Sequence, residues 1–172
     1  KGCDMLPDAY RNYIHAGGKA SFLVLGTGEP WTQNQFRSMA YQYPGRFNAI
    51  IDYNEALAHQ IYAGSDYLIM PSRVEPCGLN QMYALRYGTI PIVRSTGGLK
   101  DTVIDFGEPG GFGIRFNHAS VWDITYSIHR AVELYDDKEK MTELIKQIMQ
   151  IDNSWEKSAE KYIDLYQSIQ LK

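Results

Sequence analysis

The feature that most constrains the fold is an alternation of short apolar runs with helix-like segments between residues 19 and 116. The apolar runs have the length of strands, and the segments between them carry apolar residues at helical spacing. The predicted strands are residues 19–26, 46–51, 66–71, 89–93 and 111–116, and the predicted helices are 32–44, 54–64, 80–88 and 97–105. This alternation is typical of βαβ units and predicts an α/β fold, a Rossmann-like, doubly wound parallel sheet.

Local signals refine these boundaries. Asn54 is a plausible helix N-cap, Gly64 falls at the end of the same helix, and Gly88 closes the next one. The run 66–71 contains few polar residues, which predicts a strand buried on both faces. Pro91 has no N–H for a sheet ladder, so we expect it near the start of its strand.

The last third of the chain is predicted to be entirely helical. Its apolar residues step by three and four in three runs, which are Val121, Ile124, Ile128, Val132 and Tyr135; Met141, Leu144, Ile145, Ile148 and Met149; and Trp155, Ala159, Tyr162, Ile163, Tyr166 and Ile169. Asn153 and Glu156 have the spacing of a capping box. We expect residues 1–172 to form a single domain, since this is an ordinary length for one core.

Composition excludes several classes of function. The formal charge of −3 and the pI of about 5.8 argue against a nucleic-acid partner, and no apolar run is long enough for a membrane span. The two cysteines, Cys3 and Cys77, indicate a reducing compartment. The four histidines are scattered and no metal-binding spacing is present, so we expect no structural metal site. Because the chain begins at Lys1, we expect it to be a piece of a longer polypeptide.

Four loops are predicted to meet at the carboxyl edge of the sheet, where doubly wound folds bind ligands. They are residues 26–30, 52–56, 72–79 and 94–99. In the first, Gly26 and Gly28 are two glycines of a dinucleotide fingerprint, but Trp31 stands where the third belongs. A tight turn is therefore the favoured interpretation of that loop.

The stretch EPCGLNQ, residues 75–81, is a stronger candidate for a ligand site. Gly78 permits close approach of backbone to a ligand, and the helix that follows directs its positive end into the same space. Glu75 would accept hydrogen bonds from sugar hydroxyls or offset developing positive charge. The alternative, that Glu75 only caps the following helix, remains open on spacing alone.

A second loop repeats this design at the next strand end. Thr96, Gly97 and Gly98 precede a predicted helix whose N–H groups are candidates for binding a phosphate. Tyr53, in the loop 52–56, is a candidate for stacking on a base, although a place in the core is the usual role of a tyrosine.

Residues 72–103, read SRVEPCGLNQMYALRYGTIPIVRSTGGLKDTV, closely resemble the signature of bacterial glycogen synthases and plant starch synthases. The runs EALAHQIYAGSDYLIMP, YPGRF and NSW…YIDLY are similar to the same family, so the resemblance covers essentially the whole chain. It implies the C-terminal, nucleotide-binding half of a GT-B glycosyltransferase, with the last helix, about 154–172, crossing to an N-terminal domain. Such enzymes transfer glucose from ADP-glucose to the non-reducing end of an α-1,4-glucan, with retention and without a metal or other cofactor. The resemblance also implies a location in bacterial cytoplasm, with a plastid as the alternative.

The resemblance also implies roles for residues that contact the sugar. Glu75 matches the glutamate that lies against the donor glucose, as an electrostatic and positioning group rather than a covalent nucleophile. Cys77, Gly78 and Leu79 match the loop whose backbone approaches that sugar. The glucan acceptor would be brought by the N-terminal domain.

Other matches concern the nucleotide. Asn80 falls at the helix start that faces the donor phosphate, and Tyr53 matches an aromatic residue that stacks on adenine. Lys1 and Gly2 are similar to the end of a segment whose lysine and arginine hold the diphosphate. Tyr83 stands where many relatives outside the synthases have a second glutamate, so ribose binding by a carboxylate is not implied. Two alternatives stay open: an isolated nucleotide-binding module without activity, and a GT-B relative with another sugar-nucleotide chemistry.

Overall fold

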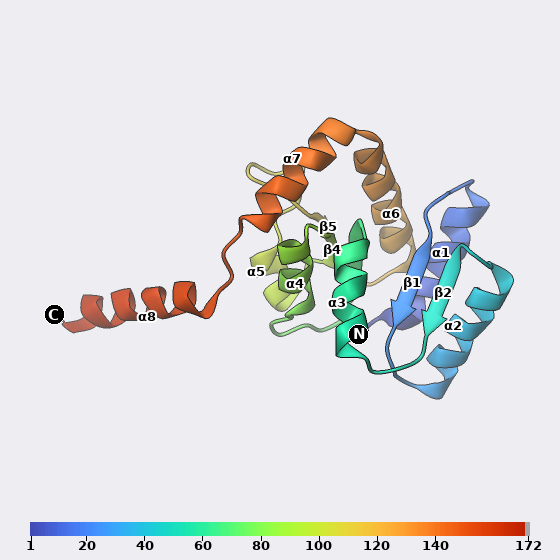
Figure 1. Cartoon of the computed structure of the whole chain (residues 1–172), viewed down its shortest axis with the longest axis horizontal. Helices are drawn as coiled ribbons and strands as arrows, with labels where there is room; N and C mark the ends of the chain where they lie inside the picture. The colour runs from blue at the N-terminus through green and yellow to red at the C-terminus, as the bar shows by residue number, and fades with distance from the viewer. Residues whose placement is uncertain (171–172) are drawn as a thin grey trace.

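A computed structural model describes residues 1–170 and confirms the alternation of strands and helices (Figure 1). The strands are β1 (Phe22–Leu25), β2 (Phe47–Ile50), β3 (Tyr67–Met70), β4 (Ile90–Arg94) and β5 (Ile114–Phe116). The helices are the 3-10 helix η1 (Cys3–Met5) and α1 (Leu6–His15), α2 (Pro30–Gln42), α3 (Glu55–Gly64), α4 (Asn80–Tyr87), α5 (Gly97–Thr102), α6 (Val121–Asp136), α7 (Lys138–Met149) and α8 (Trp155–Gln170). Each predicted strand is present, whereas η1 and α1 were not predicted.

The strands form two sheets rather than one. β1 pairs with β2, and β3, β4 and β5 pair in that order. Every pair is parallel, as predicted, with Phe22 opposite Phe47 in the first sheet and Ile69 opposite Ile92 in the second. The parallel, helix-covered architecture is therefore right, but within residues 1–170 no ladder joins β1 to β3.

Helix α1 joins the two sheets through one hydrophobic cluster. Its Tyr10 is fully buried, with its ring centroid 4.6 Å from that of Phe22 and 5.1 Å from that of Phe47. The same cluster contains Ile92 and Ile114 from the other sheet. Helix α1 thus holds β1–β2 and β3–β4–β5 side by side on one face, because its apolar residues reach both.

Several local predictions are confirmed. The Asn54 Oδ1 accepts a hydrogen bond from the Leu57 N–H, 2.9 Å away, and Gly64 ends α3. Gly88 closes α4 in the left-handed region at φ 81°. Pro91 is the second residue of β4, near the strand start.

Two local predictions are wrong. β3 is not buried on both faces, because only Met70 is buried and its other residues are half-buried. Asn153 does not cap α8 with Glu156. Instead the Ser154 Oγ accepts from the Lys157 N–H at 3.2 Å, so the hydroxyl one residue later performs the capping.

Helix α8 extends away from the rest of the molecule (Figure 1) and has no buried residue. Trp155, Tyr162 and Tyr166 are exposed by 87%, 58% and 61%, so the aromatic stripe of this helix faces solvent. The final residues of the expected helix, 171–172, lie outside the described residues. That α8 crosses to another domain stays a prediction.

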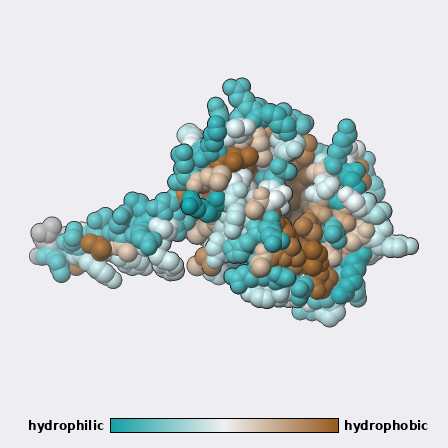
Figure 2. All heavy atoms as spheres, in the orientation of Figure 1, coloured by the Kyte–Doolittle hydropathy of each residue, from teal (hydrophilic) through white to brown (hydrophobic). Residues whose placement is uncertain are grey.

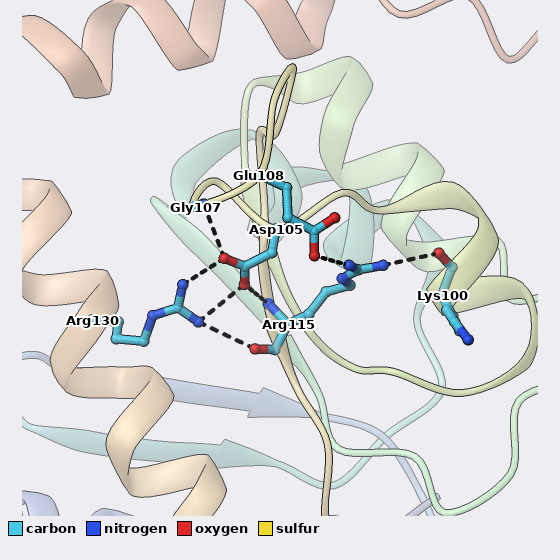
Figure 3. A network of polar contacts seen from close by, with 6 residues as sticks. All are labelled: Lys100, Asp105, Gly107, Glu108, Arg115 and Arg130. Carbon is cyan, nitrogen blue, oxygen red and sulfur yellow. Dashed lines mark hydrogen bonds and ion pairs between the residues drawn. The ribbon is translucent and has the colours of Figure 1, made fainter.

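The loop between α5 and β5 is held in place by a carboxylate, Asp105, whose side chain is 14% exposed (Figure 3). Asp105 accepts two hydrogen bonds from the Arg130 guanidinium, at 2.6 and 3.0 Å. The backbone N–H groups of Arg115 and Gly107 donate to the same carboxylate at 2.7 and 3.0 Å. Burial would raise the pKa of Asp105, but the Arg130 hydrogen bonds and the two N–H groups outweigh it and the pKa is lowered.

Replacing this carboxylate will destabilise the fold. We expect Asp105→Asn to lower the free energy of unfolding by about 2 kcal/mol at neutral pH, since Arg130 loses its charged partner. Because the folded-state pKa is depressed, the wild-type contribution is present above the unfolded pKa and is lost as pH falls through the folded value. Urea unfolding at pH 7 and below pH 4 measures both effects, and the two proteins should converge in acid. An equal gap at both pH values would contradict this assignment.

Candidate functional site

A cavity of about 300 Å³ opens at the carboxyl end of β3, between the amino-terminal residues and the loop 72–79. Its lining residues come from β3, this loop, the start of α4 and the first position of the chain; they are Lys1, Met70, Glu75, Gly78, Leu79 and Asn80. Five of these six were predicted as site residues, and Met70 was not.

Glu75 is the buried charge of this cavity. Its side chain is 7% exposed, and both carboxylate oxygens accept from the Lys1 Nζ at 2.6 Å. The Ser72 Oγ donates to Oε2 at 2.9 Å. Burial would raise the pKa of Glu75, but hydrogen bonds from Lys1 and Ser72 outweigh it, so the pKa is lowered and the group is ionised at neutral pH.

Helix α4 begins at the same cavity, at Asn80. Its N-cap residue, Leu79, provides no side-chain hydrogen bond to the first turn. The positive end of the helix dipole therefore faces the cavity without a capping carboxylate, and Glu75 binds Lys1 and Ser72 rather than this helix. The geometry removes helix capping as the explanation of Glu75.

Gly78 and Gln81 fix the shape of the loop. Gly78 lies at φ +76°, a backbone conformation that strains any other residue, and a Cβ there would come 2.7 Å from the Gln81 Oε1 and force Gln81 to shift. The Gln81 Nε2 donates to the carbonyls of Gly78 and Cys77, at 2.9 and 3.3 Å, and to the Thr102 Oγ1 at 3.1 Å. Buried Gln81 thereby joins the loop to α5.

The second glycine-rich loop supports the first instead of lining the cavity. A Cβ on Gly97 would lie 2.0 Å from the Glu75 carbonyl oxygen, and one on Gly98 would lie 2.1 Å from that of Cys77. The Gly98 N–H, which the sequence assigned to a phosphate, donates to the carbonyls of Glu75 and Pro76 at 3.2 and 3.1 Å. Its donor is occupied because the two loops pack backbone against backbone.

Adding one methyl group at this contact will displace the loop that carries Glu75. We expect Gly98→Ala to destabilise the protein by about 1 to 3 kcal/mol, as overpacking of a rigid backbone contact does. Gly64→Ala is the matched control, since a Cβ there meets nothing within 4 Å. Thermal unfolding of both variants tests this, and equal midpoints would contradict the close packing described.

Two arginines hold the same loop from outside the cavity. The Arg94 Nη1 donates to the carbonyls of Ser72 and Arg73 at 3.0 and 2.5 Å. Arg73 in turn binds the Asp4 carboxylate through both terminal nitrogens, at 2.5 and 2.8 Å. Sequence reasoning missed Ser72, Arg94 and Gln81; the position of Arg94 at the carboxyl end of β4 was the available signal for its role.

Not all predicted site residues meet at the cavity. Tyr53 is 83% exposed and lies in the loop between β2 and α3. Cys77 is exposed on the loop 72–79, and Thr96 is the half-buried N-cap of α5; none of the three lines the cavity. Their roles toward a ligand stay predictions.

Residues 1–170 contain neither a candidate metal site nor a helix suited to a membrane. No group of three or more His, Cys, Asp or Glu side chains in this part of the chain is arranged to hold a metal ion. None of the described helices combines the length and apolar character required to cross a membrane.

Comparison with known proteins identifies the family. The pattern of the family described as "Glycosyl transferases group 1" matches residues 1–151. The chain is 54% identical over 170 residues to a glycogen synthase of Flavobacterium johnsoniae and 46% identical over 169 residues to one of Thermodesulfovibrio yellowstonii. Each comparison covers 98% of the chain but only 36% and 33% of the relative, so the chain spans about a third of their length.

Solved structures support the same conclusion. The catalytic domain of starch synthase IV from Arabidopsis thaliana, bound to ADP and acarbose, superposes with a TM-score of 0.84 at 38% identity and covers 98% of the chain and 36% of that protein. A sucrose-phosphate synthase from Thermosynechococcus elongatus shares the fold, with a TM-score of 0.71 at 20% identity over 99% of the chain and 43% of its own. The predicted fold class is confirmed, and the chain belongs to the group 1 family of glycosyl transferases.

Proposed function

We propose that this chain is the donor-binding part of a retaining glucosyltransferase, which moves glucose from ADP-glucose to the non-reducing end of an α-1,4-glucan. The observation that carries the proposal is the buried, ionised Glu75, held by Lys1 beside the uncapped start of α4. The 54% identity to a glycogen synthase, and the likeness to a starch synthase bound to ADP, support the choice of reaction and donor.

The cavity contains charged groups of both signs, as this reaction requires. Transfer leaves negative charge on the departing diphosphate and positive charge on the sugar carbon. Lys1 and the positive end of α4 are suited to the diphosphate, and the Glu75 carboxylate is suited to the sugar. The Lys1 side chain is 66% exposed, so a ligand phosphate that enters the cavity would compete with Glu75 for the Lys1 ammonium.

Glu75 acts on the sugar through its charge in this proposal, and no covalent bond to it is formed. With both oxygens engaged by Lys1 and one by Ser72, the carboxylate is positioned by its hydrogen bonds. The departing phosphate then accepts the proton of the acceptor hydroxyl on the same face of the sugar. Isolation of a glucosyl ester on Glu75 would overturn this part of the mechanism.

The proposed function is tested with the complete polypeptide that carries these residues. It should elongate a maltooligosaccharide with ADP-glucose as donor, measured as radiolabelled glucose incorporated, and more slowly with UDP-glucose. Tyr53→Ala should weaken ADP binding by about tenfold in calorimetric titration, because stacking on a base is lost. Tyr41→Ala, which removes another exposed tyrosine, is the control. Transfer from UDP-glucose alone, or none to a glucan, would favour a relative with different sugar-nucleotide chemistry.

A second candidate applies to the 172 residues by themselves. Because they span about a third of the relatives' length, we expect this piece alone to be a nucleotide-binding module that binds ADP weakly and transfers no glucose. The acceptor would contact the remainder of the polypeptide, with α8 as the crossing helix. Glucan elongation by residues 1–172 alone would rule this candidate out.

A further inference from the structure

Arg94 is the last residue of β4, at the carboxyl edge of the sheet β3–β4–β5. Its Nη1 donates to the carbonyl oxygens of Ser72 and Arg73, at 3.0 and 2.5 Å, and its Nε donates to that of Asn117 at 3.3 Å. Ser72 lies just beyond β3, and Asn117 directly follows β5. One guanidinium therefore joins the segments that leave β3 and β5 to the end of β4.

The guanidinium of Arg94 binds carbonyl oxygens only. Within residues 1–170 it has no carboxylate partner, whereas Arg73, Arg115 and Arg130 each pair with a carboxylate. Its planar fork holds several donors in fixed directions, which the single ammonium of a lysine does not reproduce. Arg94 does not line the cavity, so its influence on a ligand there passes through the backbone that it holds.

Ser72 connects this backbone contact to the charge in the cavity. The residue is 2% exposed, and its Oγ donates to the Glu75 Oε2 at 2.9 Å. Ser72 is thus bound at both ends, with its carbonyl oxygen on Arg94 and its hydroxyl on Glu75. A shift of the Ser72 backbone would move this hydroxyl relative to the carboxylate that it contacts.

The backbones of Ser72 and Glu75 are held by different partners. The Gly98 N–H donates to the carbonyls of Glu75 and Pro76, at 3.2 and 3.1 Å, so α5 fixes the second half of the loop. No backbone–backbone hydrogen bond in residues 1–170 involves Ser72, and Arg94 supplies the partner of its carbonyl. Loss of the Arg94 side chain would therefore release Ser72 while Glu75 stays attached to α5.

The surroundings of Glu75 make the place of the Ser72 hydroxyl important. Met70 and Leu79 line the same cavity, and Figure 2 shows hydrophobic surface between α3 and the β1–β2 pair, beside the amino terminus marked in Figure 1. In residues 1–170 the side chains that donate to the Glu75 carboxylate are those of Lys1 and Ser72. A buried carboxylate that loses one of these donors is poorly compensated by water.

We propose that Arg94 is a positioning residue for glucosyl transfer, which holds the Ser72 carbonyl and thereby places the hydroxyl that orients the Glu75 carboxylate. The inference rests on the proposed function, in which this carboxylate acts on the sugar carbon. Arg94 itself touches neither the sugar nor the nucleotide. The alternative is a structural role alone, in which Arg94 only ties the ends of the strands together.

A double-mutant cycle in the complete polypeptide tests whether Arg94 acts through Ser72. Arg94→Met and Ser72→Ala should each lower kcat by about 10- to 100-fold, because the carboxylate is misplaced, and should leave the Kd for ADP close to that of wild type. The double variant should be no slower than the slower single variant, since both changes remove the same hydrogen bond. If Arg94→Met does not fold, Arg94→Lys takes its place in the cycle.

Arg86→Met is the matched control for the loss of an arginine. The Arg86 Nη1 also donates to a carbonyl, that of Met149 at 3.3 Å, but Arg86 does not line the cavity. Its kcat should equal that of wild type. Arg94→Lys should retain part of the activity, because it keeps the charge but not the geometry of the fork.

The ionisation of Glu75 provides a readout that does not depend on turnover. Burial raises the pKa of Glu75, and hydrogen bonds from Lys1 and Ser72 lower it. Displacing the Ser72 hydroxyl removes one of the lowering contacts, so the pKa of Glu75 should rise in Arg94→Met as it does in Ser72→Ala. Carbon-13 NMR of the glutamate carboxyl groups during a pH titration measures this, with Glu75→Gln to assign the resonance.

Each contrary result has its own meaning. Losses of kcat that multiply in the double variant would show that Arg94 acts independently of Ser72 and would overturn the proposal. An unchanged kcat with a lowered midpoint of thermal unfolding, or an unchanged pKa of Glu75 in Arg94→Met, would leave Arg94 a structural residue only. A wild-type polypeptide that transfers no glucose would contradict the proposed function instead, and the NMR titration would still test the connection from Arg94 to Glu75.

Discussion

Glu75→Gln should lower the kcat of the complete polypeptide by about 10² to 10³, the range reported for removing one preorganised electrostatic group from an active site. The substitution keeps the shape of the side chain and one acceptor oxygen, but it replaces the other oxygen with a donating amide and removes the charge that Lys1 and Ser72 hold in place. Because this charge acts on the sugar carbon only as positive charge develops there, the loss falls on the transition state.

The affinity for ADP distinguishes the loss of the Glu75 charge from general damage to the fold of the variant. ADP lacks the glucose, so its Kd in Glu75→Gln should stay within about threefold of wild type. Glu143→Gln, an exposed residue of α7, is the matched control and should leave both quantities unchanged. Wild-type kcat in Glu75→Gln would remove Glu75 from the mechanism, and a parallel loss of ADP binding would reassign it to the nucleotide.

The alternation of strands and helices was predictable because its signals are local. Asn54 and Gly88 mark helix ends through their own backbone preferences, and each apolar run marks a strand by its length. Helix α1 was missed although Leu6, Ala9, Tyr10 and Tyr13 have helical spacing. The division into two sheets was beyond such reasoning, since strand pairing depends on residues distant in sequence.

Prediction of the candidate site was limited in the same way, because contacts between residues distant in sequence cannot be inferred from spacing. Glu75 and Gly78 were identifiable because a charge and a glycine follow a strand end. The hydrogen bond from Arg94 to the Ser72 carbonyl joins residues 22 positions apart, which spacing does not reveal. Gly98 was correctly noticed but assigned to a phosphate, because its sequence alone does not show that the Glu75 and Pro76 carbonyls occupy its N–H.

Lys1→Met should lower kcat/KM for ADP-glucose by about 10² to 10³, because the cation that stabilises the departing diphosphate is lost from the cavity. Lys1→Arg keeps the positive charge and should recover part of this activity, though not all, since a planar guanidinium places its donors differently. Lys19→Met, an exposed lysine just before β1, is the control. Steady-state kinetics of the three variants measure the effect.

The pH dependence of the same variant distinguishes a role in the site from a structural one. Lys1 is the main group that holds the pKa of Glu75 below its ordinary value against the opposing effect of burial. Without it burial prevails, the pKa of Glu75 rises, and the carboxylate is protonated at a higher pH. The acid limb of kcat/KM should therefore move to higher pH in Lys1→Met and stay near its wild-type position in Lys1→Arg. A uniform loss of activity with an unshifted acid limb would mean that Lys1 does not act on Glu75 in the working enzyme.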